Sequence, residues 1–250
     1  MSNATPARTL VAIPVFNEQK YVTEVLDEVR QYVDDILVID DGSTDHTPTL
    51  LALQPVDVIR HKTNRGYGRS LIDAFRWCQC QCYSYEWLIT MDCDEQHEPA
   101  SLPTFFQAIE RDDADVISGS RYLDIQVCGD PPPEDRRAIN TTMTQRINER
   151  LGLSITDSFC GFKAYRIDAI RKLDLSESGY AFPLQFWVQA VAHDLRITEV
   201  PIRLIYNDPN RSFGGPLDDA QRRLKHYTDV FERELAKFPT KFAQTCCSGA

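Results

Sequence analysis

Short apolar runs alternate with segments of helical spacing along the first half of the chain. The apolar runs predict buried strands over residues 9–15, 35–39, 56–60, 87–91 and 114–119. Between them, apolar residues recur every three or four positions, which predicts helices over residues 18–32, 45–53, 67–81 and 99–111. Asn17 is expected to cap the first of these helices, and Thr44 or Asp45 the second. Repeated strand–helix–strand units indicate an α/β fold, with a mostly parallel central sheet and helices on both faces.

The second half of the chain is less regular. A proline-rich segment over residues 129–134 breaks the pattern and is predicted to form a loop. Beyond it we expect helices over residues 136–151, 183–193 and 217–237, and short strands over residues 162–165, 196–200 and 202–205. We predict one domain over residues 9–238, a disordered N-terminus or tag remnant over 1–8, and a flexible tail over 239–250.

Composition and charge argue against several classes of protein. The 250 residues include 37 acidic and 27 basic side chains, for a formal net charge of -10. A dedicated nucleic-acid binder needs a net basic face, so no nucleic-acid partner is expected. No apolar run approaches the roughly 18–20 residues that span a bilayer, and no basic region precedes an apolar core at the N-terminus. We therefore expect a cytoplasmic protein.

Eight cysteines are scattered along the chain. In a chain of this length without a secretory signal, reduced thiols are expected. Cys78, Cys80 and Cys82 form a run that could bind a metal. No second pair lies at ligand spacing, so a structural role is favoured.

Polar side chains follow all five strands predicted in the first half. In an open parallel sheet, ligands bind beyond the carboxyl ends of the strands. The residues found there, strand by strand, are Asn17 and Glu18, then Asp40, Asp41 and Ser43, then Asn64, Arg65, Gly66 and Gly68, then Asp92, Asp94 and Gln96, then Ser120 and Arg121. Turn preferences explain any one of these groups, but they explain five together poorly.

The segment Asp92-Cys93-Asp94-Glu95-Gln96 gives the sharpest chemical signal. In an extended backbone, Asp92, Asp94 and Gln96 point the same way. Two carboxylates and an amide oxygen are hard ligands suited to Mg²⁺ or Mn²⁺, and the cation offsets the repulsion between the carboxylates. A metal held by so few groups keeps coordination positions for a diphosphate.

Other phosphate-binding and catalytic motifs are absent from the sequence. There is no G-x-x-x-x-G-K-[ST] segment, which excludes a P-loop enzyme. Leu71 stands where a dinucleotide fingerprint needs its third glycine, and no G-x-S-x-G hydrolase elbow occurs. A receiver-type regulatory domain is disfavoured because the acidic pair follows the second strand, and a nucleotidyltransferase because the first strand is not followed by a glycine-rich loop.

Seven short segments, in order along residues 9–215, resemble glycosyltransferase family 2 enzymes of the GT-A fold, and among them the dolichol- or polyprenyl-phosphate mannosyltransferase-like members. The segments are Ile13-Pro14-Val15-Phe16-Asn17-Glu18, Val38-Ile39-Asp40-Asp41-Gly42-Ser43-Thr44-Asp45, Asn64-Arg65-Gly66-Tyr67-Gly68, Met91-Asp92-Cys93-Asp94-Glu95-Gln96-His97-Glu98-Pro99, Gly119-Ser120-Arg121-Tyr122, Asp157-Ser158-Phe159-Cys160-Gly161-Phe162 and Glu199-Val200-Pro201-Ile202.

The resemblance implies an inverting, metal-dependent glycosyltransferase that uses a nucleotide-diphosphate sugar of the GDP-mannose or UDP-glucose type. At matched positions it implies a nucleotide pocket lined by Pro14, Phe16 and Glu18, a base contact from Asp41, a ribose contact from Asp40 and a donor-side turn at Gly66. It further implies a Mg²⁺ or Mn²⁺ site at Asp92, Asp94 and Gln96, and phosphate or acceptor contacts from Arg121 and Arg211. The residues that the resemblance assigns to donor binding are Pro14, Phe16, Glu18, Asp40, Asp41, Gly66, Asp92, Asp94 and Arg211.

Two departures from the family pattern bear on the acceptor. Gln185 stands where many relatives have a glutamate that faces the acceptor, and glutamine is no general base. A sugar hydroxyl acceptor needs such a base, and Asp157 is the best candidate for it. The predicted catalytic residues are therefore Asp94, Asp157 and Arg121. A polyprenyl phosphate is already ionised and needs none. A lysine expected near Arg211 is also missing.

Three further expectations concern activity and partners. Because of Gln185, a catalytically weak or inactive nucleotide-sugar-binding protein of the same fold is the alternative to an active enzyme. A lipid acceptor would be met from the membrane surface, with the protein peripheral at its inner face, because no membrane helix is predicted. A homodimer is left open.

Overall fold

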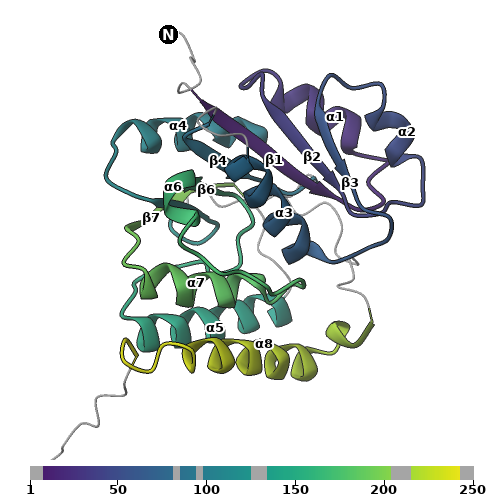
Figure 1. Ribbon diagram of the computed structural model, residues 1–250. Helices are drawn as coiled ribbons and strands as arrows, with labels where there is room; N and C mark the ends of the chain where they lie inside the picture. Colours follow the sequence, from purple (N-terminus) through teal and green to yellow (C-terminus); the bar gives the residue numbers. More distant parts are fainter. Residues whose placement is uncertain (1–7, 81–84, 94–97, 125–133, 204–214, 243–250) are drawn as a thin grey trace, which may run out of the picture.

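The computed structural model describes residues 8–80, 85–93, 98–124, 134–203 and 215–242, and within these ranges the strands form one seven-stranded sheet (Figure 1). The strands are β1 (Thr9–Val15), β2 (Ile36–Asp40), β3 (Asp57–Arg60), β4 (Trp87–Thr90), β5 (Val116–Ser120), β6 (Lys163–Arg166) and β7 (Ile197–Pro201). Their order is β3-β2-β1-β4-β6-β5-β7, and β6 alone runs antiparallel to its neighbours β4 and β5. The predicted α/β fold with a mostly parallel sheet is confirmed.

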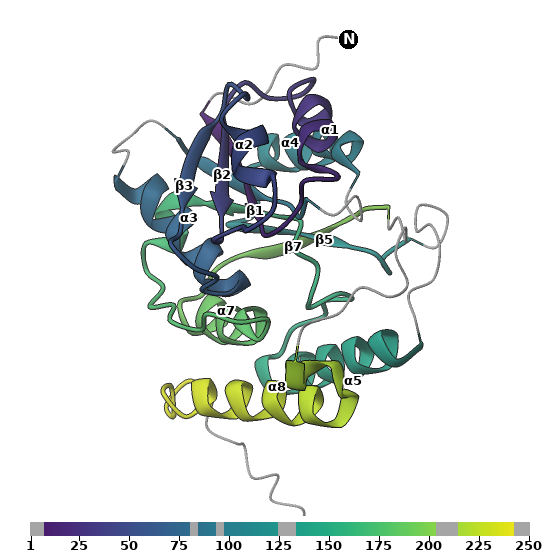
Figure 2. The same ribbon diagram turned by 90° about the vertical axis from the view of Figure 1, so that its right-hand side faces the viewer.

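Helices cover both faces of the sheet. One face carries α1 (Val22–Val29), α2 (Thr47–Leu51) and α4 (Leu102–Glu110), which follows the short helix η1 (Pro99–Ser101). The other face carries α3 (Tyr67–Cys80), α6 (Ile167–Ile170) and α7 (Phe182–Ala192). Beyond α7 lie α5 (Glu134–Leu151), η2 (Gly215–Asp218) and α8 (Ala220–Leu235), and Figures 1 and 2 show α5 and α8 as a further layer.

The central strands are buried on both sides, which explains their unbroken apolar runs. Along β1, Leu10 and Ala12 face the cluster formed with α3 and α7, whereas Val11 and Ile13 face the cluster formed with α1 and α4. All four side chains have 0% exposure. Alternate residues of the strand therefore pack into two separate cores, one on each side of the sheet.

Two helix starts differ from the sequence prediction. Asn17 does not cap the first helix, which begins at Val22; it has a positive φ of 58° and its side chain accepts hydrogen bonds from the segment after β2. For the second helix, His46 takes the capping position, while the Asp45 carboxylate accepts from the backbone N–H of Thr47 at 2.9 Å. The turn after β1 is hydrogen-bonded to the turn after β2 through Asn17, and the helices begin only beyond these turns.

The C-terminal part shows three further differences. The short helix α6 was not predicted, because four residues are too few to display a period. A strand was predicted over 202–205, but β7 ends at Pro201 and Ile202 and Arg203 are not in a strand; 204 and 205 lie outside the described residues. In the predicted flexible tail, residues 239–242 form a turn, and Phe242 packs against the core.

The cysteines that the structure describes are free thiols. Cys78 is buried in the core below α3, and burial raises the pKa of its thiol to about 12. This packing agrees with the structural role predicted for it. Within the described ranges, no helix has both the length and the apolar character needed to cross a membrane.

Candidate active site

The carboxyl ends of the parallel strands meet at one edge of the sheet, hereafter the carboxyl edge. Because β6 is antiparallel, its first residue, Lys163, pairs with Thr90 near the end of β4, and with Ser118 of β5. The segment that leads into β6, residues 157–162, therefore reaches the carboxyl edge too. We call it the entry segment, and it links the ends of β4 and β5.

The entry segment forms an ion pair with Arg121, the residue that follows β5. The Arg121 guanidinium donates to Asp157 through Nε to Oδ2 at 2.6 Å and through Nη2 to Oδ1 at 2.9 Å. The Nδ2 of Asn140, on α5, adds a third bond to Oδ1 at 2.9 Å. Asp157 has 0% exposure, so this is a buried, bidentate ion pair.

Its ion pair decides what Asp157 can do chemically. Burial alone raises the pKa of this carboxyl, but the charge of Arg121 and its hydrogen bonds outweigh burial and hold the pKa well below its ordinary value. A carboxylate with so low a pKa accepts protons poorly near neutral pH. The prediction that Asp157 serves as a general base therefore has no support in this geometry, whereas a role in positioning Arg121 has.

A carboxylate on β7 fixes the entry segment from the other side. Glu199 accepts from the backbone N–H groups of Thr156 at 2.8 Å and Asp157 at 3.1 Å. Burial raises the pKa of this carboxyl, although its hydrogen bonds oppose the shift. No role was predicted for Glu199 from the sequence. The structure shows that its carboxylate fixes the backbone at Thr156 and Asp157, and Asp157 in turn binds Arg121.

The residue after β4 meets the same entry segment. A Cβ added at Gly161 would lie 2.7 and 2.8 Å from the two carboxylate oxygens of Asp92, and 2.6 Å from the hydroxyl of Tyr67. Thr90 Oγ1 donates to the carbonyl oxygen of Gly161 at 2.7 Å and fixes this approach. Burial first, and then the charge and hydrogen bond of Asp92, raise the pKa of Tyr67 well above its ordinary value, so its hydroxyl stays a donor.

This cradle fits the predicted metal site. Asp92 is held at the end of a buried strand, next to a glycine whose missing side chain makes room at its oxygens. The other two predicted ligands, Asp94 and Gln96, lie outside the described residues, as does the predicted phosphate contact Arg211. Among the residues that are described, no group of three or more His, Cys, Asp or Glu side chains could hold a metal ion.

The acidic pair Asp40 and Asp41, at the end of β2, forms hydrogen bonds and an ion pair with neighbouring segments. The Asp41 carboxylate accepts from the backbone N–H groups of Arg65 and Gly66, each at 2.8 Å. The Asp40 carboxylate accepts from the Ser43 N–H at 2.8 Å, and the Nε of Arg60 lies 3.1 Å from its second oxygen. These contacts bring the ends of β2 and β3 together, and the predicted base and ribose contacts remain predictions.

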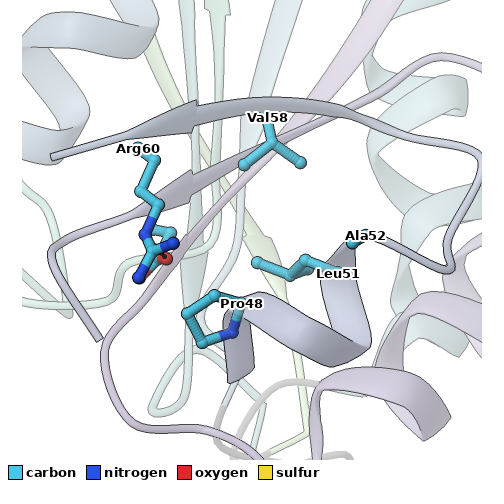
Figure 3. A pocket seen from close by; sticks show the side chains of 6 residues that line it. Pro48, Leu51, Ala52, Val58 and Arg60 are labelled. Carbon is cyan, nitrogen blue, oxygen red and sulfur yellow. Dashed lines mark ion pairs between the residues drawn. The ribbon is translucent and has the colours of Figure 1, made fainter. Parts of the chain in front are cut away.

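Beside Asp40 lies a small hollow of about 170 Å³ between α2 and β3. Figure 3 shows it bordered by the side chains of Pro48, Leu51, Ala52 and Val58, with Arg60 at one end. Its walls are mostly apolar and it lies on the α2 side of the sheet. None of the residues that line it belongs to the entry segment.

The last residues of β1 and those that follow it form the remaining part of the edge. Pro14 is half-buried, Phe16 is 42% exposed, and Glu18 is buried. Asn17 ties this turn to the next strand, because its N–H donates to Ser43 Oγ at 2.9 Å and its Oδ1 accepts from the Thr44 N–H at 2.8 Å. An exposed aromatic ring such as that of Phe16 is suited to stacking on the flat π face of a nucleobase.

Gly66 occupies a position that only glycine can fill. Its φ is +101°, and a Cβ there would lie 2.4 Å from the carbonyl oxygen of Ser178. The same carbonyl accepts from the N–H of Arg69 at 3.0 Å. The turn at the start of α3 is therefore packed against the loop that precedes α7.

Gln185 lies in the interior between α7 and α8, 2% exposed. Its Oε1 accepts from the N–H groups of Ser176 and Glu177 at 2.8 and 2.7 Å, and its Nε2 donates to Glu234 Oε2 at 2.9 Å. Gln189, one helical turn on, donates to the other oxygen of Glu234 at 2.7 Å. A glutamate at 185 would face the buried Glu234 carboxylate, so the glutamine has a structural explanation.

Comparison with known proteins adds to this geometry. The family model described as glycosyl transferase family 2 matches residues 10–174. An undecaprenyl-phosphate mannosyltransferase of Micrococcus luteus is 33% identical over 228 residues, which cover 85% of this chain and 90% of that protein. A polyprenol monophosphomannose synthase of Mycolicibacterium smegmatis is 33% identical over 206 residues, or 78% of this chain and 76% of that protein.

Solved structures resemble the fold. The glucosyl-3-phosphoglycerate synthase of Mycobacterium tuberculosis, in complex with uridine diphosphate, superposes with a TM-score of 0.67 at 15% identity, over 95% of this chain and 80% of that one. The same enzyme has been solved with Mn²⁺, uridine diphosphate and glucosyl-3-phosphoglycerate, again with a TM-score of 0.67. At this identity the likeness establishes the fold alone.

Proposed function

The chain belongs to glycosyltransferase family 2 and has the GT-A fold, and from that premise we propose that it transfers a hexose from a nucleotide-diphosphate sugar to a polyprenyl phosphate. The observation that carries the proposal is the entry segment, which holds Arg121 through Asp157 and lies against Asp92 through Gly161. One loop thus contacts a cation after β5 and a carboxylate after β4, the two strands on either side of β6.

The roles of the two strand ends follow from the charges in the reaction. Departure of a nucleoside diphosphate builds negative charge on its phosphate oxygens. Asp92, with Asp94 and Gln96, would hold Mg²⁺ or Mn²⁺, which supplies charge stabilisation to the diphosphate when bound. Arg121 is directed by its pair with Asp157, so its guanidinium is preorganised for phosphate oxygens without further ordering.

The class of acceptor is inferred from two described residues, Asp157 and Gln185, at the positions where a general base was considered. Asp157 is a poor proton acceptor, and Gln185 is turned into the interior. An acceptor hydroxyl would need a base, whereas a phosphate monoester is ionised near neutral pH and attacks without one. The relatives from Micrococcus luteus and Mycolicibacterium smegmatis are named undecaprenyl-phosphate mannosyltransferase and polyprenol monophosphomannose synthase, which supports the same class of acceptor.

The stereochemistry and the place of reaction follow from this proposal. Direct attack of the acceptor phosphate oxygen on the anomeric carbon, with departure of the nucleoside diphosphate, inverts the configuration at that carbon. Because the acceptor is anchored in a bilayer, the enzyme would work at the inner face of the membrane as a peripheral protein. The donor pocket would use Pro14, Phe16 and Glu18 at the end of β1, and the Gly66 turn between β3 and α3.

The test is transfer from radiolabelled GDP-mannose and UDP-glucose to short-chain polyprenyl phosphate in detergent, with Mn²⁺, Mg²⁺ or chelator. Label that enters the organic phase with one donor, and only with metal, is the expected result. Asp92→Asn should abolish it. Nucleotide binding without transfer to any acceptor would favour the inactive binding protein, and the absence of both would contradict the proposal.

A further inference from the structure

A buried histidine links the acidic pair after β2 to helix α3. His61 follows β3, and its Nδ1 lies 2.6 Å from Asp41 Oδ1 while its Nε2 lies 3.0 Å from Asp73 Oδ2. The side chain of His61 is 5% exposed, and those of Asp41 and Asp73 are 6% and 14% exposed. The ring is therefore held between two carboxylates and shielded from solvent.

Two acceptors require two donors. A neutral imidazole carries one N–H and one lone pair, so it would set a lone pair against one carboxylate. With both nitrogens protonated, the ring donates to Asp41 and Asp73 at once and its charge lies between opposite charges. Further cations face Asp73 from the Gly66 turn and α3: Arg69 Nε at 2.7 Å, Arg76 Nη1 at 3.6 Å and Arg65 Nη1 at 3.8 Å.

The bond to Asp41 passes on to the backbone of the Gly66 turn. The same carboxylate that accepts from His61 accepts from the N–H groups of Arg65 and Gly66. Gly42, next to Asp41, leaves no room for a side chain, because a Cβ there would lie 2.4 Å from the backbone of Thr63. The Asp41 carboxylate thus fixes the turn over residues 61–66, and the His61 ring fixes the Asp41 carboxylate.

We propose that His61, with both ring nitrogens protonated, is the positioning residue that holds Asp41 and the Gly66 turn in the shape that receives the donor nucleotide. The inference rests on the proposed function, since it assumes that the nucleotide binds at this edge. His61 touches no donor atom in this account. It acts through Asp41, and Asp73 is its second anchor.

The protonation of the ring can be tested without any nucleotide. Nitrogen-15 NMR of histidine-labelled protein distinguishes protonated from unprotonated ring nitrogens, and His61→Gln assigns the signal by its loss. The expected result is one histidine with both nitrogens protonated at pH 7 and coupled to slowly exchanging protons. A His61 signal from a neutral ring at that pH would overturn the proposal.

The positioning role is tested by calorimetric titration with GDP and UDP in the presence of Mn²⁺. We expect His61→Gln to weaken binding of the preferred nucleotide by at least about tenfold, the effect of one lost charge-assisted hydrogen bond. His46→Gln is the matched control, since His46 is exposed at the start of α2 and should bind as wild type. Melting temperatures of both variants would correct for the folded fraction.

A second variant separates positioning from mere folding. A glutamine at position 61 can donate its amide N–H to one carboxylate, but its amide oxygen then faces the other. Asp73→Asn supplies an N–H donor to that oxygen, so in the His61→Gln background it should restore several-fold of the lost affinity. Because Asp73→Asn also removes the carboxylate that pairs with Arg69, the single Asp73→Asn variant is titrated as well. Undiminished binding by His61→Gln would overturn the proposal, as would additive losses in His61→Gln and Asp73→Asn. If the wild-type chain bound neither nucleotide, the proposed function would fall and the positioning role with it, while the NMR result would still report the state of the ring.

Discussion

Arg121 and Asp157 face each other through two near-parallel hydrogen bonds, one residue at the end of β5 and the other at the start of the entry segment. The pair is buried on the aspartate side and 16% exposed on the arginine side. Such a pair is costly to desolvate and brings little net stability compared with apolar packing. Its position at the carboxyl edge therefore points to a functional reason for keeping it.

Replacing Arg121 by lysine is predicted to lower transfer at least about 100-fold, because a lysine cannot donate two bonds in a fixed plane. Arg196→Lys is a matched control. Arg196 forms the same kind of bidentate pair with Asp115, with Nη2 to Oδ1 at 2.9 Å, but at the opposite edge of the sheet and 51% exposed. Rates of sugar transfer for the two variants give the comparison, and equal losses would contradict a special role for Arg121.

Alanine at Gly161 should damage the proposed metal site while leaving the fold intact. Its Cβ would lie 2.6–2.8 Å from Tyr67 and Asp92, so one of these side chains must move. We expect the concentration of Mn²⁺ that gives half-maximal activity to rise about tenfold or more. Gly179→Ala is the control, since the nearest atom to its Cβ would be 3.5 Å away. Metal titration of transfer activity, with circular dichroism to verify folding, checks both variants.

A result in which Gly161→Ala and Gly179→Ala have the same metal dependence would count against Asp92 as a metal ligand. Loss of folding in Gly161→Ala would leave Tyr67→Phe as the cleaner probe. That variant removes only the hydroxyl that faces Asp92, and it too should raise the requirement for Mn²⁺.

Sheet architecture was accessible from the sequence because strands buried on both faces leave continuous apolar runs, as in β1 and β2. The carboxyl edge was accessible too, since polar residues such as Asp41 and Asp92 follow those runs. The antiparallel direction of β6 was not, because a four-residue strand carries no sign of its direction. Yet this reversal brings the entry segment to Asp92 and Arg121.

Contacts between distant segments were the other limit. The ion pair of Asp157 with Arg121 could not be predicted, because the two residues are 36 positions apart and nothing in the sequence joins them. The contacts of His61 are likewise not visible in the sequence, because its partners are the carboxylates of Asp41 and Asp73, which the tertiary fold brings to the ring. A buried polar side chain is understood only when its partners are known, and these are set by the tertiary fold.

Gln185→Glu is predicted to destabilise the protein by about 2–4 kcal/mol, because it sets a second carboxylate against the buried Glu234. Adding Glu234→Gln should recover much of the loss, since a donor then faces the new carboxylate again. Chemical denaturation of the two single variants and the double variant measures this coupling.

An exposed pair provides the control for that cycle. Gln145 donates to Glu149 at 2.8 Å on the surface of α5, so Gln145→Glu should change the free energy of unfolding by no more than about 0.5 kcal/mol. A similar cost at positions 145 and 185 would contradict the interior network, and so would additivity of Gln185→Glu and Glu234→Gln.

The last prediction concerns the pH dependence of stability and distinguishes the two roles considered for Asp157. Its pKa in the folded protein is held below the ordinary value, chiefly by Arg121 against the opposing effect of burial. A depressed pKa contributes stability above the unfolded-state value of about 3.9, and that contribution is lost as the pH falls toward the folded-state value. Asp157→Asn should therefore lower the free energy of unfolding by about 3–5 kcal/mol at pH 7, because Arg121 loses its partner.

The difference between wild type and Asp157→Asn should stay constant from pH 8 to about pH 5 and shrink only below about pH 4. Asp168→Asn, at a side chain 83% exposed, should stay within about 0.5 kcal/mol of wild type throughout. Urea denaturation at each pH provides the values. A general base working near neutrality needs a raised pKa, so a difference that changed between pH 6 and 8 would restore the catalytic role, whereas a constant one leaves Asp157 as the anchor of Arg121.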